Sequence, residues 1–249
     1  MLTDDILGTL DGLGLHAMAE ALRGQMASPR QIALAFEDRL AALVEAERLA
    51  RAEGRVARFV RRSALPQAAA VADIDFRRPR GLRRDLIATL ARGDWVRGHQ
   101  NLLITGPPGI GKTFVACALG AEALRQGLAV EYGRTVEVVE RLIEAHEERR
   151  LQATLKKLNR ARLLILDDFA ADEVTAVQTQ WLRRLIAARD GRGSTLIASS
   201  VPVENWGDRL PDPDSADAIV DRFHGTHAHR IALAGASMRT GRKAVSPLS

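Results

Sequence analysis

The residues with the clearest chemistry lie at 101–113, where a glycine-rich run leads into a lysine and a threonine. This run matches the phosphate-loop pattern G-x-x-x-x-G-K-[ST] and consists of Gly106, Pro107, Pro108, Gly109, Ile110, Gly111, Lys112 and Thr113. An apolar run at 102–104 precedes it, and a segment with helical spacing at 114–124 follows it. Because strand, glycine loop and helix in this order bind nucleotide phosphates, a chance glycine-rich turn is the weaker interpretation.

Each residue type in this loop has a physical role toward a nucleotide. Glycines let the backbone approach the phosphates without a Cβ clash, and the N–H groups at a helix start hold the anion. Lys112 is expected to reach the β- and γ-phosphates, and the Thr113 hydroxyl is expected to coordinate Mg²⁺. The loop therefore predicts ATP and Mg²⁺ as ligands.

An acidic pair, Asp167 and Asp168, forms the second motif and follows the apolar run 163–166. In open α/β sheets, ligands bind beyond the carboxyl ends of the strands. Asp167 is expected to hold Mg²⁺ through water, and Asp168 to polarise the water that attacks the γ-phosphate. Two surface aspartates after a strand are common in isolation, but the upstream phosphate loop favours a Walker-B interpretation.

The rest of the chain supplies the elements that must position these motifs. Apolar runs suggest strands at 102–104, 128–132, 163–166, 194–200 and 229–233, with helices between them. This alternation predicts an α/β fold of the P-loop NTPase type, with a doubly wound parallel sheet. We further expect a small all-α N-terminal domain at 1–65, a linker at 66–80, a nucleotide-binding domain at 81–240 and a flexible tail at 241–249.

A series of arginines closes the helical N-terminal segment. At about 100° per residue their 3-4-3-4 spacing places them on one narrow stripe, which consists of Arg48, Arg51, Arg55, Arg58 and Arg62. Within this run only Glu53 offsets their charge. Aligned arginines suit a row of phosphates, so we predict DNA contact here, and an acidic protein partner is the alternative.

A second basic series occupies 149–162 without an acidic residue inside it. Outside the arginine stripe, the candidate DNA contacts are Arg134, Lys156 and Lys157. Overall charge is weaker evidence: the net charge is +5, but only 4 of the 36 basic residues are lysines, an arginine bias that genome base composition also produces.

Composition also argues against several classes of protein. No apolar run approaches the ~20 residues of a membrane helix, and the start MLTDDILGTL lacks the basic region of a secretory signal. A single cysteine, Cys117, excludes a disulfide framework and favours a reducing compartment. We therefore expect a globular, cytoplasmic protein without a membrane partner.

Together these motifs resemble AAA+ ATPases of the helicase-loader branch, and more closely the IstB-like transposition helper ATPases of bacterial insertion sequences. The resemblance extends over nearly the whole chain. It includes FEDRLAALVEAE (36–47) and DIDFRRPRGL (73–82), and it is most specific in VPVENW (201–206), DAIVDR (217–222) and HRI (229–231). It implies that 81–240 is an AAA+ ATPase domain.

The resemblance implies roles for further residues. Arg222 matches the arginine finger that reaches the γ-phosphate in a neighbouring subunit, and Arg239 falls where the family has a second phosphate-sensing arginine. Ser199 or Ser200 matches the first sensor position, and Ser200 is preferred. Two residue types depart from the pattern: Asp168 stands where AAA+ proteins usually have Glu, which suggests slow hydrolysis, and the Ser-Ser pair stands where a longer amide side chain is common.

The function implied by the resemblance is that of an ATP-dependent helper of DNA transposition. ATP-bound subunits would form a homo-oligomer on duplex DNA, largely independent of sequence, with ATP sites between subunits, and would recruit and activate a partner transposase until hydrolysis resets them. No acidic triad of the kind that cuts DNA is evident. The alternatives are a DnaC-like replicative helicase loader, a small-molecule kinase, and a DNA-binding scaffold whose ATP site only supports assembly.

Overall fold

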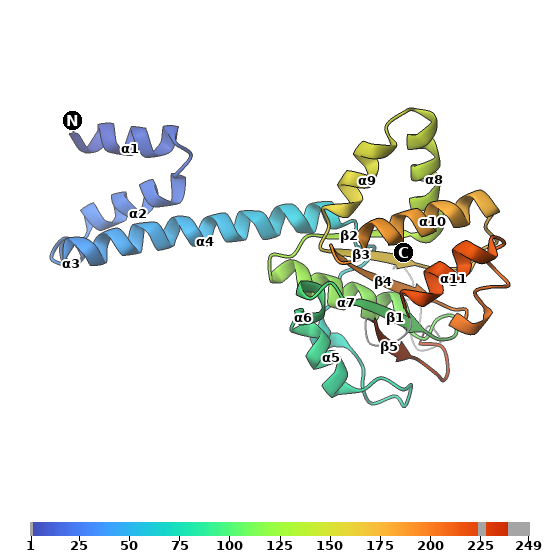
Figure 1. Cartoon of the computed structure of the whole chain (residues 1–249). Helices are drawn as coiled ribbons and strands as arrows, with labels where there is room; N and C mark the ends of the chain where they lie inside the picture. The colour runs from blue at the N-terminus through green and yellow to red at the C-terminus, as the bar shows by residue number, and fades with distance from the viewer. Residues whose placement is uncertain (1, 224–227, 239–249) are drawn as a thin grey trace, which may run out of the picture. The chain divides into compact units, whose positions relative to one another are not determined.

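The computed structural model describes residues 2–223 and 228–238, which divide into two compact units (Figure 1). The division falls between Arg58 and Phe59, inside helix α4 (Phe36–Ser63), whereas we expected the helical domain to end at residue 65. The last turns of α4 belong to the second unit because Phe59 packs against its hydrophobic core.

The first unit consists of α1 (Leu2–Gly12), α2 (His16–Ala27), α3 (Pro29–Ile32) and most of α4. Buried Gln25 in α2 donates from Nε2 to the Arg39 carbonyl at 2.9 Å. The Glu47 carboxylate in α4 accepts from the Met18 N–H at 3.1 Å. A carboxylate near a helix start interacts favourably with the N–H groups there, so Glu47 holds α4 to the first turn of α2.

The second unit is built on a parallel sheet with strand order β2-β3-β4-β1-β5. Its strands are β1 (Asn101–Thr105), β2 (Val130–Arg134), β3 (Leu163–Asp167), β4 (Ser194–Ser199) and β5 (Ala228–Ala232). All strand pairs among the described residues are parallel. Parallel neighbours require crossover connections, and helices supply them. The predicted α/β fold with a parallel sheet is therefore confirmed.

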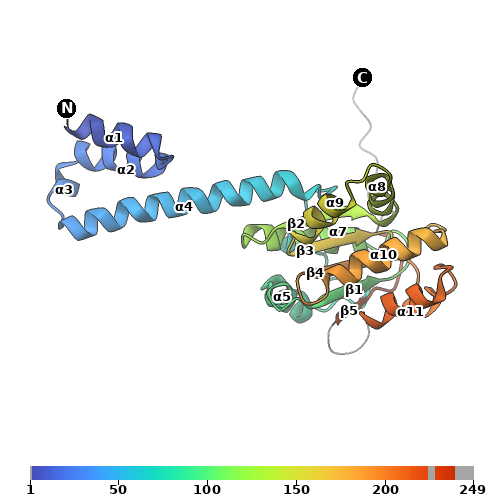
Figure 2. The same ribbon diagram turned by 45° about the horizontal axis from the view of Figure 1, so that its top comes forward.

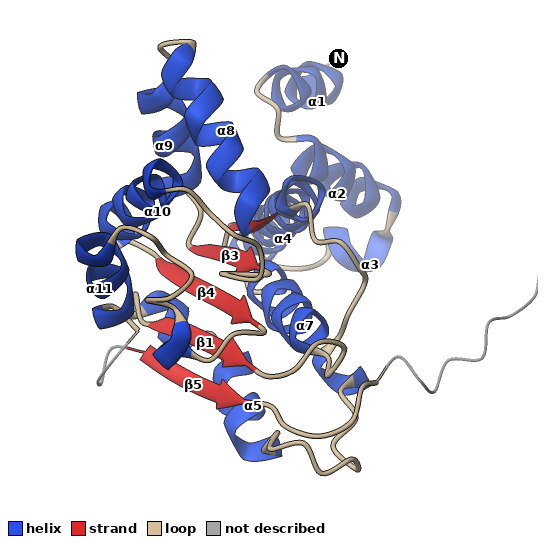
Figure 3. Ribbon diagram, turned by 90° about the vertical axis from the view of Figure 1, so that its right-hand side faces the viewer, coloured by secondary structure: helices blue, strands red, loops and turns tan. Residues whose placement is uncertain are grey.

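Helices cover both faces of this sheet (Figure 3). One face packs against α5 (Arg84–Ala91), α6 (Asp94–Arg97) and α7 (Lys112–Arg125). The other face packs against α8 (Thr135–Glu147), α9 (Leu151–Asn159), α10 (Ala176–Arg189) and α11 (Pro213–Asp221), of which α10 and α11 lie side by side (Figure 2). Two short 3-10 helices, η1 (Val71–Asp73) and η2 (Val203–Asn205), complete the unit.

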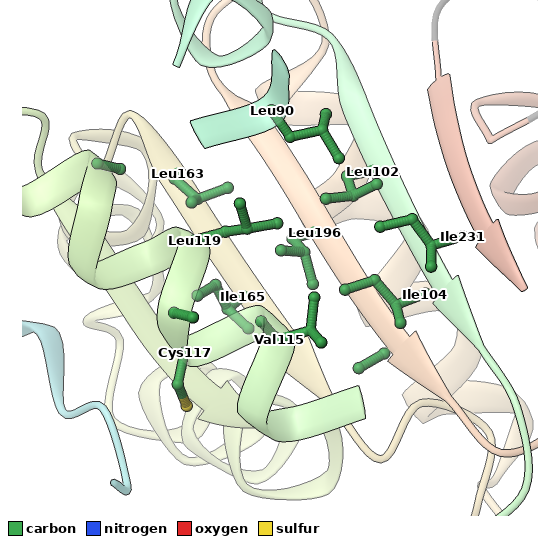
Figure 4. Packing of buried hydrophobic residues seen from close by; sticks show 14 of the residues in the cluster. Leu90, Leu102, Ile104, Val115, Cys117, Leu119, Leu163, Ile165, Leu196 and Ile231 are labelled. Carbon is green, nitrogen blue, oxygen red and sulfur yellow. The ribbon is translucent and has the colours of Figure 1, made fainter. Parts of the chain in front are cut away.

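Alternate residues of each strand serve the two faces, because successive side chains of a strand point in opposite directions. In β1, Leu102 and Ile104 pack with Val115 and Leu119 of α7 (Figure 4), whereas Leu103 joins the cluster on the opposite face. The strands are therefore apolar throughout, as both faces are covered. None of the helices in the described parts of the chain combines the length and apolarity that crossing a membrane requires.

Since the strands are parallel, their carboxyl ends lie at one edge of the sheet, where ligands bind in open α/β folds. The phosphate-loop run follows β1. Asp167 ends β3 and Ser199 ends β4, and Asp168 and Ser200 come directly after them. The fold thus brings three separate motifs to one edge. Arg222 follows α11 and lies at the opposite edge, beside the start of β1, as its hydrogen bond to Asn101 shows below.

Candidate nucleotide-binding site

The phosphate loop joins β1 to α7 through three glycines with positive φ, Gly106 (149°), Gly109 (76°) and Gly111 (99°). A Cβ on Gly106 would lie 2.4 Å from the Leu233 carbonyl oxygen, so only glycine fits against the segment that follows β5. Helix α7 begins at Lys112 directly after the loop. Its first N–H groups and the positive end of its dipole therefore meet at the loop, as anion binding requires.

Lys112 is 7% exposed, and its ammonium group donates to two carbonyls of its own loop. The distances from Nζ are 2.7 Å to the Gly106 oxygen and 3.0 Å to the Pro107 oxygen. An ammonium has three donors, so these two bonds orient the group at the mouth of the loop. The geometry fits the predicted role, in which phosphate oxygens accept from the same ammonium.

Asp167 is 2% exposed, and both its carboxylate oxygens accept hydrogen bonds. The Tyr132 hydroxyl donates to Oδ2 at 2.8 Å, and the Asp168 N–H donates to Oδ1 at 3.0 Å. Burial and this carboxylate raise the pKa of Tyr132, so its hydroxyl stays a donor. The Thr135 hydroxyl also donates to the Asp167 carbonyl at 2.9 Å. Tyr132 and the Asp168 N–H therefore orient the carboxylate, while Thr135 holds the backbone of the same residue.

Asp168 differs from its neighbour because it is half-exposed and has a positive φ of 52°. Asparagine and aspartate tolerate this left-handed conformation better than other non-glycine residues. Arg134, at the end of the adjacent strand β2, donates from Nε to Asp168 Oδ2 at 3.2 Å. Arg134 Nη2 also lies 4.0 Å from Asp172 Oδ2. Arg134, which we expected to contact DNA, therefore pairs with acidic residues at and after the carboxyl end of β3, and DNA contact at this residue stays a prediction.

The two candidate sensor serines have different environments. Ser199 is fully buried, and its hydroxyl donates to the Phe169 carbonyl at 2.6 Å and accepts from the Val201 N–H at 3.1 Å. Ser200 is half-buried and lines a cavity of about 560 Å³ together with Gly106 and Pro107. The geometry therefore supports the preference for Ser200, since the Ser199 hydroxyl already has structural partners.

Arg222 lies away from the phosphate loop of its own chain. Its carbonyl accepts from Asn101 Nδ2 at 3.2 Å, at the start of β1, while the loop begins after the end of that strand. A five-residue strand spans roughly 16 Å at about 3.3 Å per residue. The guanidinium donates from Nη1 to the Ala218 carbonyl at 2.5 Å, and Nε lies 3.9 Å from Asp190 Oδ2.

Arg239, the predicted second phosphate-sensing arginine, lies outside the described residues. Among the predicted DNA contacts, the side chains of Arg55 and Arg62 also lie outside them. Arg48 pairs with Glu45, and Arg51 pairs with Glu47 at 2.8 Å. The expectation that only Glu53 offsets the arginine stripe was therefore wrong, because residues three and four positions apart are neighbours on a helix. Arg58 in α4 and Lys156 and Lys157 in α9 are exposed, and their contact with DNA stays a prediction.

Two segments that contact the phosphate loop, the end of the basic run at 77–80 and residues 236–238, were missed as site residues. Arg80, which we assigned to the linker, is 4% exposed and donates from Nη1 to the Ile110 carbonyl at 2.7 Å. The Met238 N–H donates to the Gly109 carbonyl at 2.7 Å. A cavity of about 210 Å³ lies beside these contacts and is lined by Arg78, Pro79, Arg80, Ile110, Ala236 and Met238. In the sequence, the run at 77–80 shows only that this segment is basic. The burial of Arg80 depends on the tertiary fold and could not be predicted from that run.

Comparison with known proteins agrees with this geometry. A family model described as IstB-like ATP binding protein matches residues 8–246. The chain belongs to this family of insertion sequence ATP-binding proteins. An insertion sequence ATP-binding protein of Sinorhizobium fredii is 37% identical over 239 residues, which cover 96% of each chain. The ATP-binding protein of insertion sequence IS1162 from Pseudomonas fluorescens is 40% identical over 203 residues, covering 81% of this chain and 88% of its own.

Solved structures share the fold of about two thirds of this IstB-like chain. The DnaC helicase loader superposes with a TM-score of 0.56 and 18% identity, covering 66% of this chain and 96% of its own. DnaI gives a TM-score of 0.57 at 18% identity, covering 68% of this chain and 92% of its own. These likenesses concern the fold alone, and family membership supports ATP as the ligand.

Proposed function

We propose that this IstB-like protein is an ATPase that helps DNA transposition, working as an assembly of identical subunits on duplex DNA. The separation of Arg222 from its own phosphate loop carries this proposal. An arginine at the far edge of the sheet completes an ATP site only when it comes from another subunit. Hydrolysis then depends on assembly, as with arginine fingers supplied in trans.

ATP would bind with its phosphates at 106–113, where the start of α7 and the Lys112 ammonium converge. The oxygen ligands of Thr113 and Asp167 suit Mg²⁺, which binds few protein groups and retains water molecules and phosphate oxygens. The hydrogen bonds to the Asp167 carboxylate also support this fit, because the Tyr132 hydroxyl and the Asp168 N–H orient it. When bound, Mg²⁺ would neutralise charge on the phosphates.

For hydrolysis, Asp168 is the residue that would polarise the attacking water, and Ser200 the residue that would contact the γ-phosphate. The half-exposure of Asp168 and the place of Ser200 in the cavity beside Gly106 support these roles. Arg222 of a neighbouring subunit would stabilise the negative charge of the transition state. We assign Arg239 the second sensing role only from its place in the sequence.

The basic residues of α4 and α9 would bind the phosphates of duplex DNA without reading its sequence. Arg58, Lys156 and Lys157 are exposed and have no ion pair among the described residues. Contacts to phosphates give affinity but little specificity, which suits a helper that accepts many target sites. We place this function in the cytoplasm, with a transposase of the same insertion sequence as the partner that the ATP-bound assembly recruits.

A replicative helicase loader is the competing function, because the DnaC and DnaI structures share the fold. At 18% identity this likeness concerns the fold alone, whereas the relatives with 37% and 40% identity are named for insertion sequences. A loader would bind a helicase through its N-terminal unit. Binding of purified transposase, with the helicase as the matched competitor, distinguishes the two functions.

The test is sedimentation and duplex-DNA binding in ATP with Mg²⁺, in ADP with Mg²⁺, and without nucleotide. We expect a larger assembly and tighter DNA binding with ATP than with ADP, on duplexes of unrelated sequence. Turnover measured in the same samples separates an ATPase from a scaffold that only binds ATP. A monomer that ignores duplex DNA in all three conditions would contradict the proposal.

A further inference from the structure

Arg80 is a buried cation directly behind the phosphate loop. Its side chain donates from Nη1 to the Ile110 carbonyl at 2.7 Å and from Nη2 to the Asp75 carbonyl at 3.1 Å. A Cβ added to Gly111 would lie 2.7 Å from Arg80 Nη1, so the guanidinium group lies against the backbone of that glycine. A side chain at this position, which has a φ of 99°, would displace the guanidinium group.

The contact with Ile110 determines which way one peptide unit faces. In a planar trans peptide, the carbonyl of one residue and the N–H of the next point in opposite directions. Arg80 holds the Ile110 carbonyl on its own side of the loop, the back. The Gly111 N–H must therefore point to the opposite side, the front. This N–H donates to no acceptor among the described residues, and the front is the side where α7 begins.

Backbone contacts hold Arg80 itself in place. The Arg80 carbonyl accepts from the Ala234 N–H at 3.1 Å, and the preceding peptide unit of the loop is held by the Met238 N–H, which donates to the Gly109 carbonyl at 2.7 Å. Arg80 forms no ion pair with a carboxylate of the described chain. Burial lowers the pKa of Arg80, and only Asp75 works in the other direction.

From these contacts we propose that Arg80 is a positioning residue of the nucleotide site, holding the Gly111 N–H toward the phosphates and placing a buried positive charge behind them. The proposal rests on the proposed function, because it requires a nucleotide in the loop. A buried charge without a carboxylate partner is costly to maintain. A polyphosphate in front of Gly111 offsets that cost, so part of the nucleotide affinity comes from Arg80.

The experiment measures the dissociation constants of ATP and ADP, with Mg²⁺, for wild-type protein and for Arg80→Met, Arg80→Lys and Arg80→Gln. The melting temperature of each nucleotide-free variant is measured in parallel. Arg189→Met is the matched control. Arg189 is 1% exposed and donates to the carbonyls of Leu158, Ala161 and Ser194, with no carboxylate partner among the described residues and no contact with the phosphate loop.

We expect Arg80→Met to weaken binding of both nucleotides at least about tenfold, the effect of one lost charge-assisted interaction. Arg80→Lys should retain most of the affinity, because its ammonium preserves the charge and can donate to the Ile110 carbonyl. Arg189→Met should lower the melting temperature by several degrees and leave both dissociation constants within about twofold of wild type. A purely structural Arg80 would behave like this control.

Wild-type affinity in both Arg80→Met and Arg80→Gln would overturn the proposal. If Arg80→Met does not fold, the comparison of Arg80→Lys with Arg80→Gln answers the same question. Tighter binding by the lysine variant supports a positioning cation, and equal wild-type affinity in the two excludes it. Failure of the wild-type protein to bind ATP would instead contradict the proposed function, so the two failures are distinguishable.

Discussion

Arg134 Nε lies 3.2 Å from Asp168 Oδ2, so an arginine at the end of β2 holds the carboxylate that we expect to polarise the attacking water. The pairing follows from the sheet, where Arg134 and Asp167 are register partners. The hydrogen bond to Asp168 raises the pKa of Arg134, so this residue remains a cation. Asp168 must leave this partner, or share it, before it orients a water molecule.

Replacing Arg134 with glutamine should therefore raise the rate of ATP hydrolysis in the absence of DNA. Both side chains are about half-exposed, and such pairs are weak. We expect a rise of at most about fivefold, with the dissociation constant of ATP unchanged. Steady-state phosphate release with and without duplex DNA measures the effect. A fall in turnover would show that Arg134 assists the reaction and does not restrain Asp168.

Asp168→Asn should nearly abolish turnover while ATP binding and assembly persist. Asparagine suits this test because it is isosteric and also tolerates the positive φ of 52° at this position. Loss of activity is then attributable to the missing carboxylate and not to backbone strain. The measurement is single-turnover hydrolysis together with sedimentation on duplex DNA, where the variant should remain in its ATP-bound assembly. Unchanged hydrolysis would assign the water-polarising role to another group.

Tyr132→Phe should weaken the response to Mg²⁺ more than the binding of nucleotide. The variant removes the hydroxyl that donates to Asp167 Oδ2, so the carboxylate loses one of its two orienting bonds. We expect the Mg²⁺ concentration for half-maximal hydrolysis to rise several-fold, and the free energy of unfolding to fall by about 1–2 kcal/mol.

Thr135→Val is the control for Tyr132→Phe, because it removes the hydroxyl bonded to the Asp167 backbone carbonyl and leaves the carboxylate untouched. It should cost stability without moving the Mg²⁺ midpoint. Equal midpoints in both variants would mean that Tyr132 only stabilises the fold.

The motifs were predictable because their spacing is local, whereas their partners depend on the tertiary fold. The phosphate-loop run and the parallel sheet follow from short patterns in the sequence, and family membership confirms that interpretation. The bond from Tyr132 to Asp167 joins residues 35 positions apart, which only the register of β2 on β3 brings together. Arg80 lay in a basic run that resembled a solvated linker, and its burial depends on where the loop and the segment after β5 pack.

The arginine stripe of α4 can be tested by changing charges of opposite sign. Glu45 pairs with Arg48, whereas Arg58 is exposed and has no ion pair among the described residues. Glu45→Gln frees Arg48 and should strengthen duplex binding, while Arg58→Gln should weaken it and reduce the slope of log K against log salt by about 0.9. Titrations over a range of salt concentrations measure both. Identical slopes in the two variants and the wild type would assign the stripe to an acidic protein partner.

Mixing two inactive variants tests whether Arg222 acts on a neighbouring subunit. Lys112→Ala removes the ammonium of the loop but keeps Arg222, and Arg222→Ala keeps the loop, so each variant alone should hydrolyse ATP very slowly. In mixed assemblies some intact loops face an intact arginine, and turnover should recover to roughly a quarter of the wild-type value if subunits mix at random. Mixing either variant with the Lys112→Ala/Arg222→Ala double variant should recover nothing, because no site then contains both groups. An arginine acting within its own subunit would leave the first mixture inactive as well, and the ATP site would then lie within a single chain.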